Sequence, residues 1–274
     1  MFFRFYEHPG LHLPPDKQAE LRTELLQIAR GSLDPVPNYQ CLSTSPDALD
    51  DKLIVVAYTG TDPDDSDEAE SETHHPRAVA FISALYLDVP GLAHAVLHTG
   101  LTVAAPSVQR SGIVITLCTQ LFQHVMPRHP RGIWVTTLAA VLSSLVTTEQ
   151  FLYNTYPCSP SRDRASPAPL QEHLAIARTI DARYRAQLLI APAATFDEAA
   201  FVFRGSLAWA PAACFRKDGD DPRFWHRKRG ENEYFRALMR PGMGDEALLV
   251  GFIDVERIWE RLERRRVERE KARL

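Results

Sequence analysis

Three apolar segments follow one another with no helix-like segment between them, and they constrain the fold more than any other feature of the chain. They are KLIVVAYTG (residues 52–60), RAVAFISALYLDV (77–89) and HAVLHTGLTV (94–103). The first is a continuous run rich in β-branched residues, which is typical of a strand at the centre of a sheet. The acid-rich segment at 61–76 has no apolar framework and is predicted to form the tip of a hairpin between the first two strands. The sequence therefore predicts three consecutive strands of one sheet.

Helical spacing and end signals predict the elements around these strands. Residues 13–31 have apolar residues at helical spacing, with Pro14 and Pro15 at the start and Gly31 after the last periodic position. The other elements expected up to residue 160 are a strand at 2–8, a short helix at 46–51, a helix at 112–126 that is apolar on most sides and largely buried, a strand at 132–140 and a helix at 143–156.

The last hundred residues are less regular. A helix followed by a short strand is expected from QEHLAIARTIDARYRAQLLI, two strands from AAFVFRGSLAW and ALLVGFIDV, and a closing helix of mixed charge at 256–274. The segment 218–230 mixes acids, bases and aromatics, and either a lid over a ligand or a solvated loop would account for it. We expect residues 1–160 to form a core and residues 161–274 to complete the same sheet.

Composition excludes several classes of function. The formal net charge of −4 and 24% charged residues give no sign of nucleic-acid binding. The four cysteines form no CxxC pair, and no zinc spacing, P-loop or nucleophile elbow is present, so no metal is expected. The N-terminus lacks the basic region of a signal peptide, and the most apolar run, 132–146, is too short to span a membrane. We expect a cytoplasmic protein with neither a membrane nor a nucleic acid as partner; the oligomeric state stays open.

The segment LTVAAPSVQRSG (101–112) joins a predicted strand to a predicted helix through a small, polar turn. Such a turn leaves several backbone N–H groups without helical partners at the positive end of a helix dipole. This arrangement suits a phosphate or pyrophosphate, which the backbone of residues 108–113 would bind. A strand-turn-helix unit in which Gly112 serves packing alone would explain the same residues.

This segment and the order of elements around it resemble the GNAT superfamily of acyl-CoA-dependent N-acyltransferases, over residues 52–156. The turn of that superfamily reads Q/R-x-x-G-x-G/A after a strand ending L-x-V. Residues 109–113 fit the first five positions, whereas Val114 stands where Gly or Ala is usual. The Val114 side chain would either crowd the pyrophosphate or face harmlessly into the sheet.

The resemblance implies a mixed α/β (α+β) fold, in which a twisted and mostly antiparallel sheet opens into a V after the strand ending at Val103. Acyl-CoA, most simply acetyl-CoA, would enter that V as cosubstrate, and a small-molecule amine would be the acceptor. The residues expected to bind the cosubstrate are Leu101, Thr102, Val103, Val108, Gln109, Arg110, Ser111, Gly112, Ile113 and Ser143.

The chemistry requires a donor to the tetrahedral oxyanion and a proton donor to the departing thiolate. The resemblance points to the backbone N–H of Val103 for the oxyanion. For the thiolate it points to a tyrosine on the helix after the split strand, because LYNTY matches the family's L-Y-x-K except for the missing Lys. Tyr153 is therefore the first candidate and Tyr156 the second.

A general base must also be found, because only on the order of one in a thousand unperturbed amines is neutral at pH 7. His98 is the candidate, and it shares a strand face with His94. This face is opposite to that of Leu101 and Val103 unless a bulge resets the alternation, and a hydrogen-bonded structural histidine would explain His98 equally well. No Asp or Glu lies between Val89 and Glu149, so the usual carboxylate base is missing from this region.

The sequence thus predicts an N-acetyltransferase of GNAT type that works by direct attack of an amine on the thioester. The alternative comes from a different class: a non-catalytic GNAT-like fold that acts as a ligand-binding or protein-interaction module. Val114, the missing carboxylate and the long C-terminal segment favour this alternative.

Overall fold

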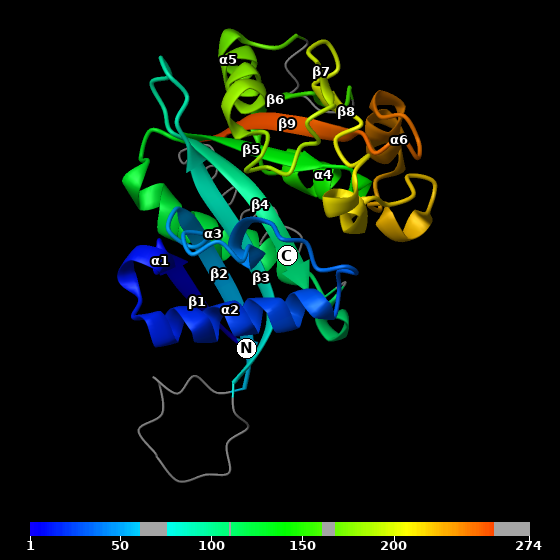
Figure 1. Ribbon diagram of the computed structural model, residues 1–274. Helices are drawn as coiled ribbons and strands as arrows, with labels where there is room; N and C mark the ends of the chain where they lie inside the picture. Colours follow the sequence, from blue (N-terminus) through cyan, green and yellow to red (C-terminus); the bar gives the residue numbers. More distant parts are fainter. Residues whose placement is uncertain (61–75, 110, 161–167, 255–274) are drawn as a thin grey trace, which may run out of the picture.

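The structure, a computed structural model, describes residues 1–60, 76–109, 111–160 and 168–254. These residues form one nine-stranded sheet with helices on both faces (Figure 1). The predicted hairpin tip at 61–76, except for its last residue, and the predicted closing helix at 256–274 lie outside the described residues.

The strands follow the predicted order through the first half of the chain. They are β1 (Phe2–Glu7), β2 (Lys52–Thr59), β3 (Arg77–Leu87), β4 (Val96–Ala104), β5 (Ile133–Ala139), β6 (Tyr153–Tyr156), β7 (Thr195–Asp197), β8 (Val202–Arg204) and β9 (Glu246–Ile253). The helices are α1 (Pro9–His12), α2 (Pro15–Arg30), α3 (Ile113–Val125), α4 (Leu142–Glu149), α5 (Gln171–Thr179, continued by a π-helical turn at Ile180–Tyr184) and α6 (Arg229–Leu238).

The sheet is mostly antiparallel, as predicted. Its strand order is β1-β2-β3-β4-β5-β9-β8-β7, and β6 pairs with β9 beside β8. Within the described ranges every pair of neighbouring strands is antiparallel except β4 and β5, which are parallel. The predicted mixed α/β fold class is confirmed.

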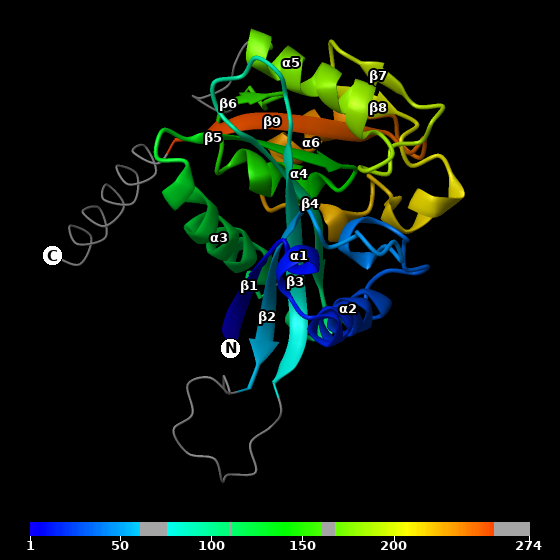
Figure 2. The same ribbon diagram turned by 60° about the vertical axis from the view of Figure 1, so that its left-hand side comes forward.

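Strand β2 is buried on both faces, which explains its unbroken apolar sequence. Its residues alternate: Leu53 and Val55 pack with α3, whereas Ile54 and Val56 pack with α2. Figure 2 shows α2 and α3 on opposite sides of the sheet. By the same alternation along β9, α4 and α6 lie on the α3 face and α5 lies on the α2 face.

The sheet splits between β4 and β5. The two strands pair only from Val96 with Trp134 to Thr99 with Thr137, although β4 continues to Ala104 and β5 to Ala139. On its other edge β4 carries a bulge, because Ile82 faces Thr102 while Ala84 faces Thr99. The predicted V is therefore present, and it begins at Thr99 rather than after Val103.

The helix predicted at 143–156 is wrong in its second half. Helix α4 ends at Glu149, and Tyr153–Tyr156 forms β6, with Tyr153 opposite Phe252 of β9. Asn154 has a left-handed φ of 45°, which a helix does not accommodate. Pairing with β9, almost a hundred residues further along the chain, therefore decides the structure here, and the local helical spacing does not.

Three smaller expectations also fail. Helix α3 is buried along one side only, and Val114 and Ile115 are 39% and 47% exposed. The short helix expected at 46–51 is a series of turns, and the strand expected at the end of residues 171–190 is a turn in which Leu189 has a φ of 58°.

The strands after residue 160 belong to the same sheet, since β9 lies between β5 and β8. The division of the chain into residues 1–160 and 161–274 stays a prediction. Among the described residues, no helix combines the length and the apolar character needed to cross a membrane.

Candidate functional site

A cavity of about 610 Å³ lies where β4 and β5 separate. Gly100, Leu101 and Thr102 of β4 form one side of it, and Leu138 and Ala139 of β5 form the other. Residues of α3 and α4 line it on one face of the sheet, and residues of loops on the α2 face line it on the other. The cavity therefore crosses the sheet.

The predicted phosphate-binding turn lies at the α3 end of this cavity. Gly112 caps the helix with a φ of 85°, and a side-chain carbon built on it would have nothing within 4 Å. Within the described ranges, the N–H groups of Gly112 and Ile113 have no hydrogen-bond partner. Gln109 donates to the Ala104 carbonyl over 3.2 Å and fixes the turn. The turn is thus open and presents free donors.

Most of the predicted cosubstrate residues line the cavity. Those on its wall are Leu101, Thr102, Gln109, Gly112, Ile113 and Ser143. Val103, Val108 and Ser111 are not on the wall, and Arg110 lies outside the described residues. Val114 is on the wall and exposed, so the idea that it faces into the sheet is wrong. Together with Ile115 and Phe151 it makes this mouth of the cavity apolar.

The backbone of β4 shows which N–H groups face the open edge. The Ala105 N–H donates to the Val79 carbonyl, so by the alternation of an antiparallel ladder the Val103 N–H points toward β3 as well. The Ala104 carbonyl accepts from Ser32 and Gln109 and so points away from β3. The N–H and carbonyl of Thr102, two residues before Ala104, also point away from β3. The Val103 N–H, the predicted oxyanion donor, therefore faces β3, and the Thr102 N–H faces the open edge.

The bulge in β4 is filled by the side chain of Gln40. Its Oε1 accepts from the Leu101 N–H over 3.0 Å and from the Ser83 hydroxyl over 2.8 Å, and its Nε2 donates to the Tyr39 hydroxyl over 2.9 Å. A side-chain carbon on Gly100 would lie 2.1 Å from Gln40 Oε1, so any larger residue here would displace the Gln40 amide from the bulge. The bulge is thereby tied to Tyr39, which lines the cavity.

Glu246 supplies the carboxylate that sequence analysis missed. It is the first residue of β9, is only 7% exposed and lines the cavity. The Ser206 hydroxyl donates to its Oε2 over 2.5 Å, and burial raises the pKa of Glu246 to about 7. Burial and then the charge of Glu246 raise the pKa of Tyr39. The two groups are therefore close enough to influence each other.

His98 also lies on the cavity wall, but its environment makes it a weak base. It is 1% exposed, its Nδ1 lies 2.9 Å from the Thr136 hydroxyl, and burial lowers its pKa to about 3. His94 packs its ring on Phe252 at 5.0 Å and does not line the cavity. Of the groups on the wall, Glu246 has the proton affinity better matched to neutral pH.

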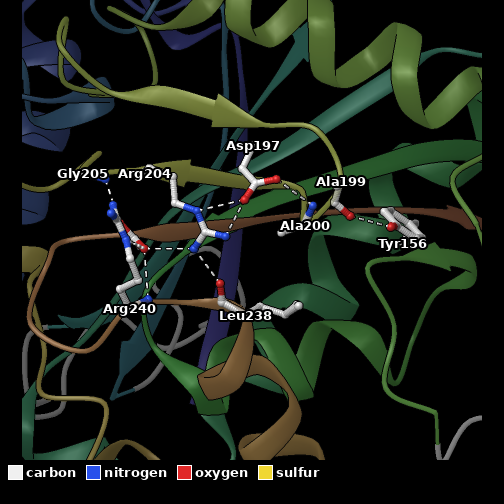
Figure 3. A network of polar contacts seen from close by, with 9 residues as sticks. Tyr156, Asp197, Ala199, Ala200, Arg204, Gly205, Leu238 and Arg240 are labelled. Atoms are coloured by element: carbon white, nitrogen blue, oxygen red, sulfur yellow. Dashed lines mark hydrogen bonds and ion pairs between the residues drawn. The ribbon is translucent and has the colours of Figure 1, made fainter.

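The two candidate tyrosines lie away from the cavity. Strand β9 separates β6 from β5, and neither Tyr153 nor Tyr156 is on the cavity wall. The Tyr156 hydroxyl donates to the Ala199 carbonyl over 2.8 Å (Figure 3). The expected place of Tyr153 on a helix beside the cleft is wrong; its role in catalysis stays a prediction. The described part of the chain has no cluster of side chains suited to a metal.

Comparison with known proteins gives similarity at the level of solved structures. A protein from Desulfovibrio desulfuricans assigned to the GNAT family of acetyltransferases is 14% identical and matches 55% of this chain and 81% of its own, with a TM-score of 0.32. NAA60 of Arabidopsis thaliana with a bisubstrate analogue is 12% identical over 54% and 81%, with a TM-score of 0.32. An aminoglycoside 6'-N-acetyltransferase complexed with coenzyme A is 16% identical over 51% and 63%, with a TM-score of 0.29.

No protein-family model and no curated protein matches the chain. The mostly antiparallel sheet, its opening beside β4 and the helix that follows β4 are the features that the sequence resemblance predicts. The chain thus has a mixed α/β fold with a split, mostly antiparallel sheet, as the sequence resemblance implies.

Proposed function

We propose that the protein is an acyl-CoA-dependent N-acyltransferase that transfers acetyl from acetyl-CoA to a small-molecule amine. The observation that carries this proposal is a buried carboxyl with a pKa near 7, Glu246, in a cavity that crosses a split sheet. A carboxyl tuned to neutral pH accepts a proton without being permanently charged.

The α3 face of the cavity suits the cosubstrate. The free N–H groups of Gly112 and Ile113 at the helix start would bind the pyrophosphate. The open edge of β4, through the Thr102 carbonyl and the Ala104 N–H, would pair with the amides of the pantetheine arm as an added strand does. The Thr102 N–H is then the donor we assign to the oxyanion.

The opposite face holds the groups for proton transfer. Glu246 would take the proton from the incoming ammonium, with Ser206 holding the carboxylate. Tyr39, whose raised pKa keeps it protonated, would donate a hydrogen bond to the departing thiolate in place of Tyr153 or Tyr156. The proton that Glu246 takes from the amine would then balance the proton that the sulfur gains, and Tyr39 would remain protonated throughout.

The test is release of free CoA, followed with a thiol reagent, from acetyl-CoA and a panel of primary amines. Amine-dependent release by the wild type and its loss in Glu246→Gln would support the proposal. Val114 at the apolar mouth favours the second candidate, a non-catalytic binding module. A rise in thermal stability with acetyl-CoA, but no release of CoA with any amine, would establish that candidate instead.

A further inference from the structure

The cavity wall on the α2 face differs in character from the wall at α3. Tyr39 and Phe215 meet edge to face with ring centroids 5.8 Å apart. Leu189 and Leu207, 8% and 2% exposed, pack in the same cluster with these rings. The four side chains line the same cavity as Glu246 and form an apolar part of its wall.

Two charged side chains interrupt this wall. Among the described residues that line the cavity, Glu246 is the one carboxyl and Lys217 the one permanent cation. Lys217 donates from Nζ to the Cys214 carbonyl over 2.8 Å. An ammonium group has three donors, so it retains N–H groups for an anionic partner.

The acidic neighbour of Glu246 is not available to a ligand. Asp245 binds Arg204 over 3.1 Å, Arg240 over 2.9 Å and the Gly205 N–H over 2.8 Å. Its side chain is fully buried, and its bonds to Arg240, Gly205 and Arg204 hold its pKa well below the usual range despite the opposing effect of burial. It therefore adds no second site for a positively charged acceptor.

From this arrangement we propose the class of the acceptor: a primary amine on an apolar or aromatic body that also carries an anionic group. The inference rests on the proposed function. The amine is directed to Glu246, the body covers the rings of Tyr39 and Phe215, and the anionic group meets Lys217. Polycations such as polyamines are disfavoured, because each further ammonium would be desolvated without a carboxylate partner.

The experiment compares three acceptors in the acetyl-CoA assay: 4-(2-aminoethyl)benzoate, phenethylamine and spermidine. The first two differ only in the carboxylate, and the third is a polycation without an aromatic body. We expect kcat/KM to rank in the order given. The advantage of the carboxylate over phenethylamine should be about tenfold, as for a charge-assisted hydrogen bond.

Lys217→Met removes the charge and keeps most of the apolar stem. It should abolish the advantage of the carboxylate, mainly through KM. Lys17→Met, on the exposed side of α2 where Lys17 pairs with Glu20, is the matched control and should keep it. A preference for spermidine, or a carboxylate advantage that survives Lys217→Met, overturns the inference while leaving the acyltransferase intact. Release of CoA with none of the three, nor with any other primary amine, overturns the proposed function and the inference with it.

Discussion

Glu246→Gln removes one titrating group and nearly preserves its shape, and its consequences can be worked out from the structure. The pKa of Glu246 is raised from 4.5 to about 7, so the folded state holds the proton more tightly than the unfolded state. This contribution to stability is fully present below pH 4.5 and is lost as the pH rises through 7. The difference corresponds to about 3 kcal/mol in the free energy of unfolding.

The variant should therefore lack this loss of stability, whereas the buried His98, whose pKa is lowered to about 3, makes both proteins equally less stable towards pH 5. Denaturant unfolding at pH 5 and pH 8 measures the free energy for both proteins, and the wild type should lose up to about 3 kcal/mol more than Glu246→Gln. Asp245, whose pKa is lowered, loses its contribution only in more acidic solution and does not overlap this window. Equal pH dependence in the two proteins would refute the buried, proton-binding state of Glu246.

The same substitution tests catalysis. With the amine in excess, the kcat/KM of the wild type for acetyl-CoA should rise with pH through an apparent pKa near 7, because Glu246 ionises there. The titration of the amine itself must be corrected for. Glu246→Gln should lower kcat/KM about a hundredfold or more and remove this limb of the profile. A limb that persists in the variant would assign the base to another group, with His98 the next to test.

Three further substitutions examine other parts of the site. Gly112→Asp places a carboxylate at the helix start and forces a φ of 85° on a side chain, and calorimetry should show CoA binding lost in a variant that still melts cooperatively. Tyr39→Phe should lower kcat about a hundredfold or more with little change in acetyl-CoA affinity. The sequence-based prediction expects the same loss from Tyr153→Phe instead. Steady-state kinetics of the two variants, measured in parallel, decide between the two tyrosines. Gly100→Ala should destabilise the protein by roughly 1–3 kcal/mol in denaturant unfolding, because the new methyl group displaces Gln40 from the bulge.

The fold could be predicted where local signals and long-range packing agree. The run of β2 is apolar because both faces of the strand are covered, and α2 has end signals that match its observed bounds. Prediction failed at Tyr153, where a local helical pattern competes with a ladder to Phe252. No residue near Tyr153 in the sequence indicates that Phe252 is its partner.

The part of the site that could be predicted is the part that a local sequence motif specifies. The turn at Gln109 and Gly112 is a local motif, and it lines the cavity. Glu246 is far from it in sequence, and only the pairing of β9 with β5 brings it to the divergence. One signal was present in the sequence, because Glu246 directly precedes the apolar run ALLV of a predicted strand. Exposure of its carboxylate to solvent is the simplest explanation of an acid at such a position. Which N–H groups of β4 face the open edge depends on the direction of the ladder, which sequence alone does not reveal.

The passage of the cavity through the sheet has a kinetic consequence. An amine that arrives from the α2 face and a thioester that arrives from the α3 face would not obstruct each other, so either could bind first and both would be present during transfer. Initial-rate plots against one substrate at fixed levels of the other should then intersect rather than run parallel. Free CoA should compete with acetyl-CoA but not with the amine, since each product would leave by the side from which its precursor came.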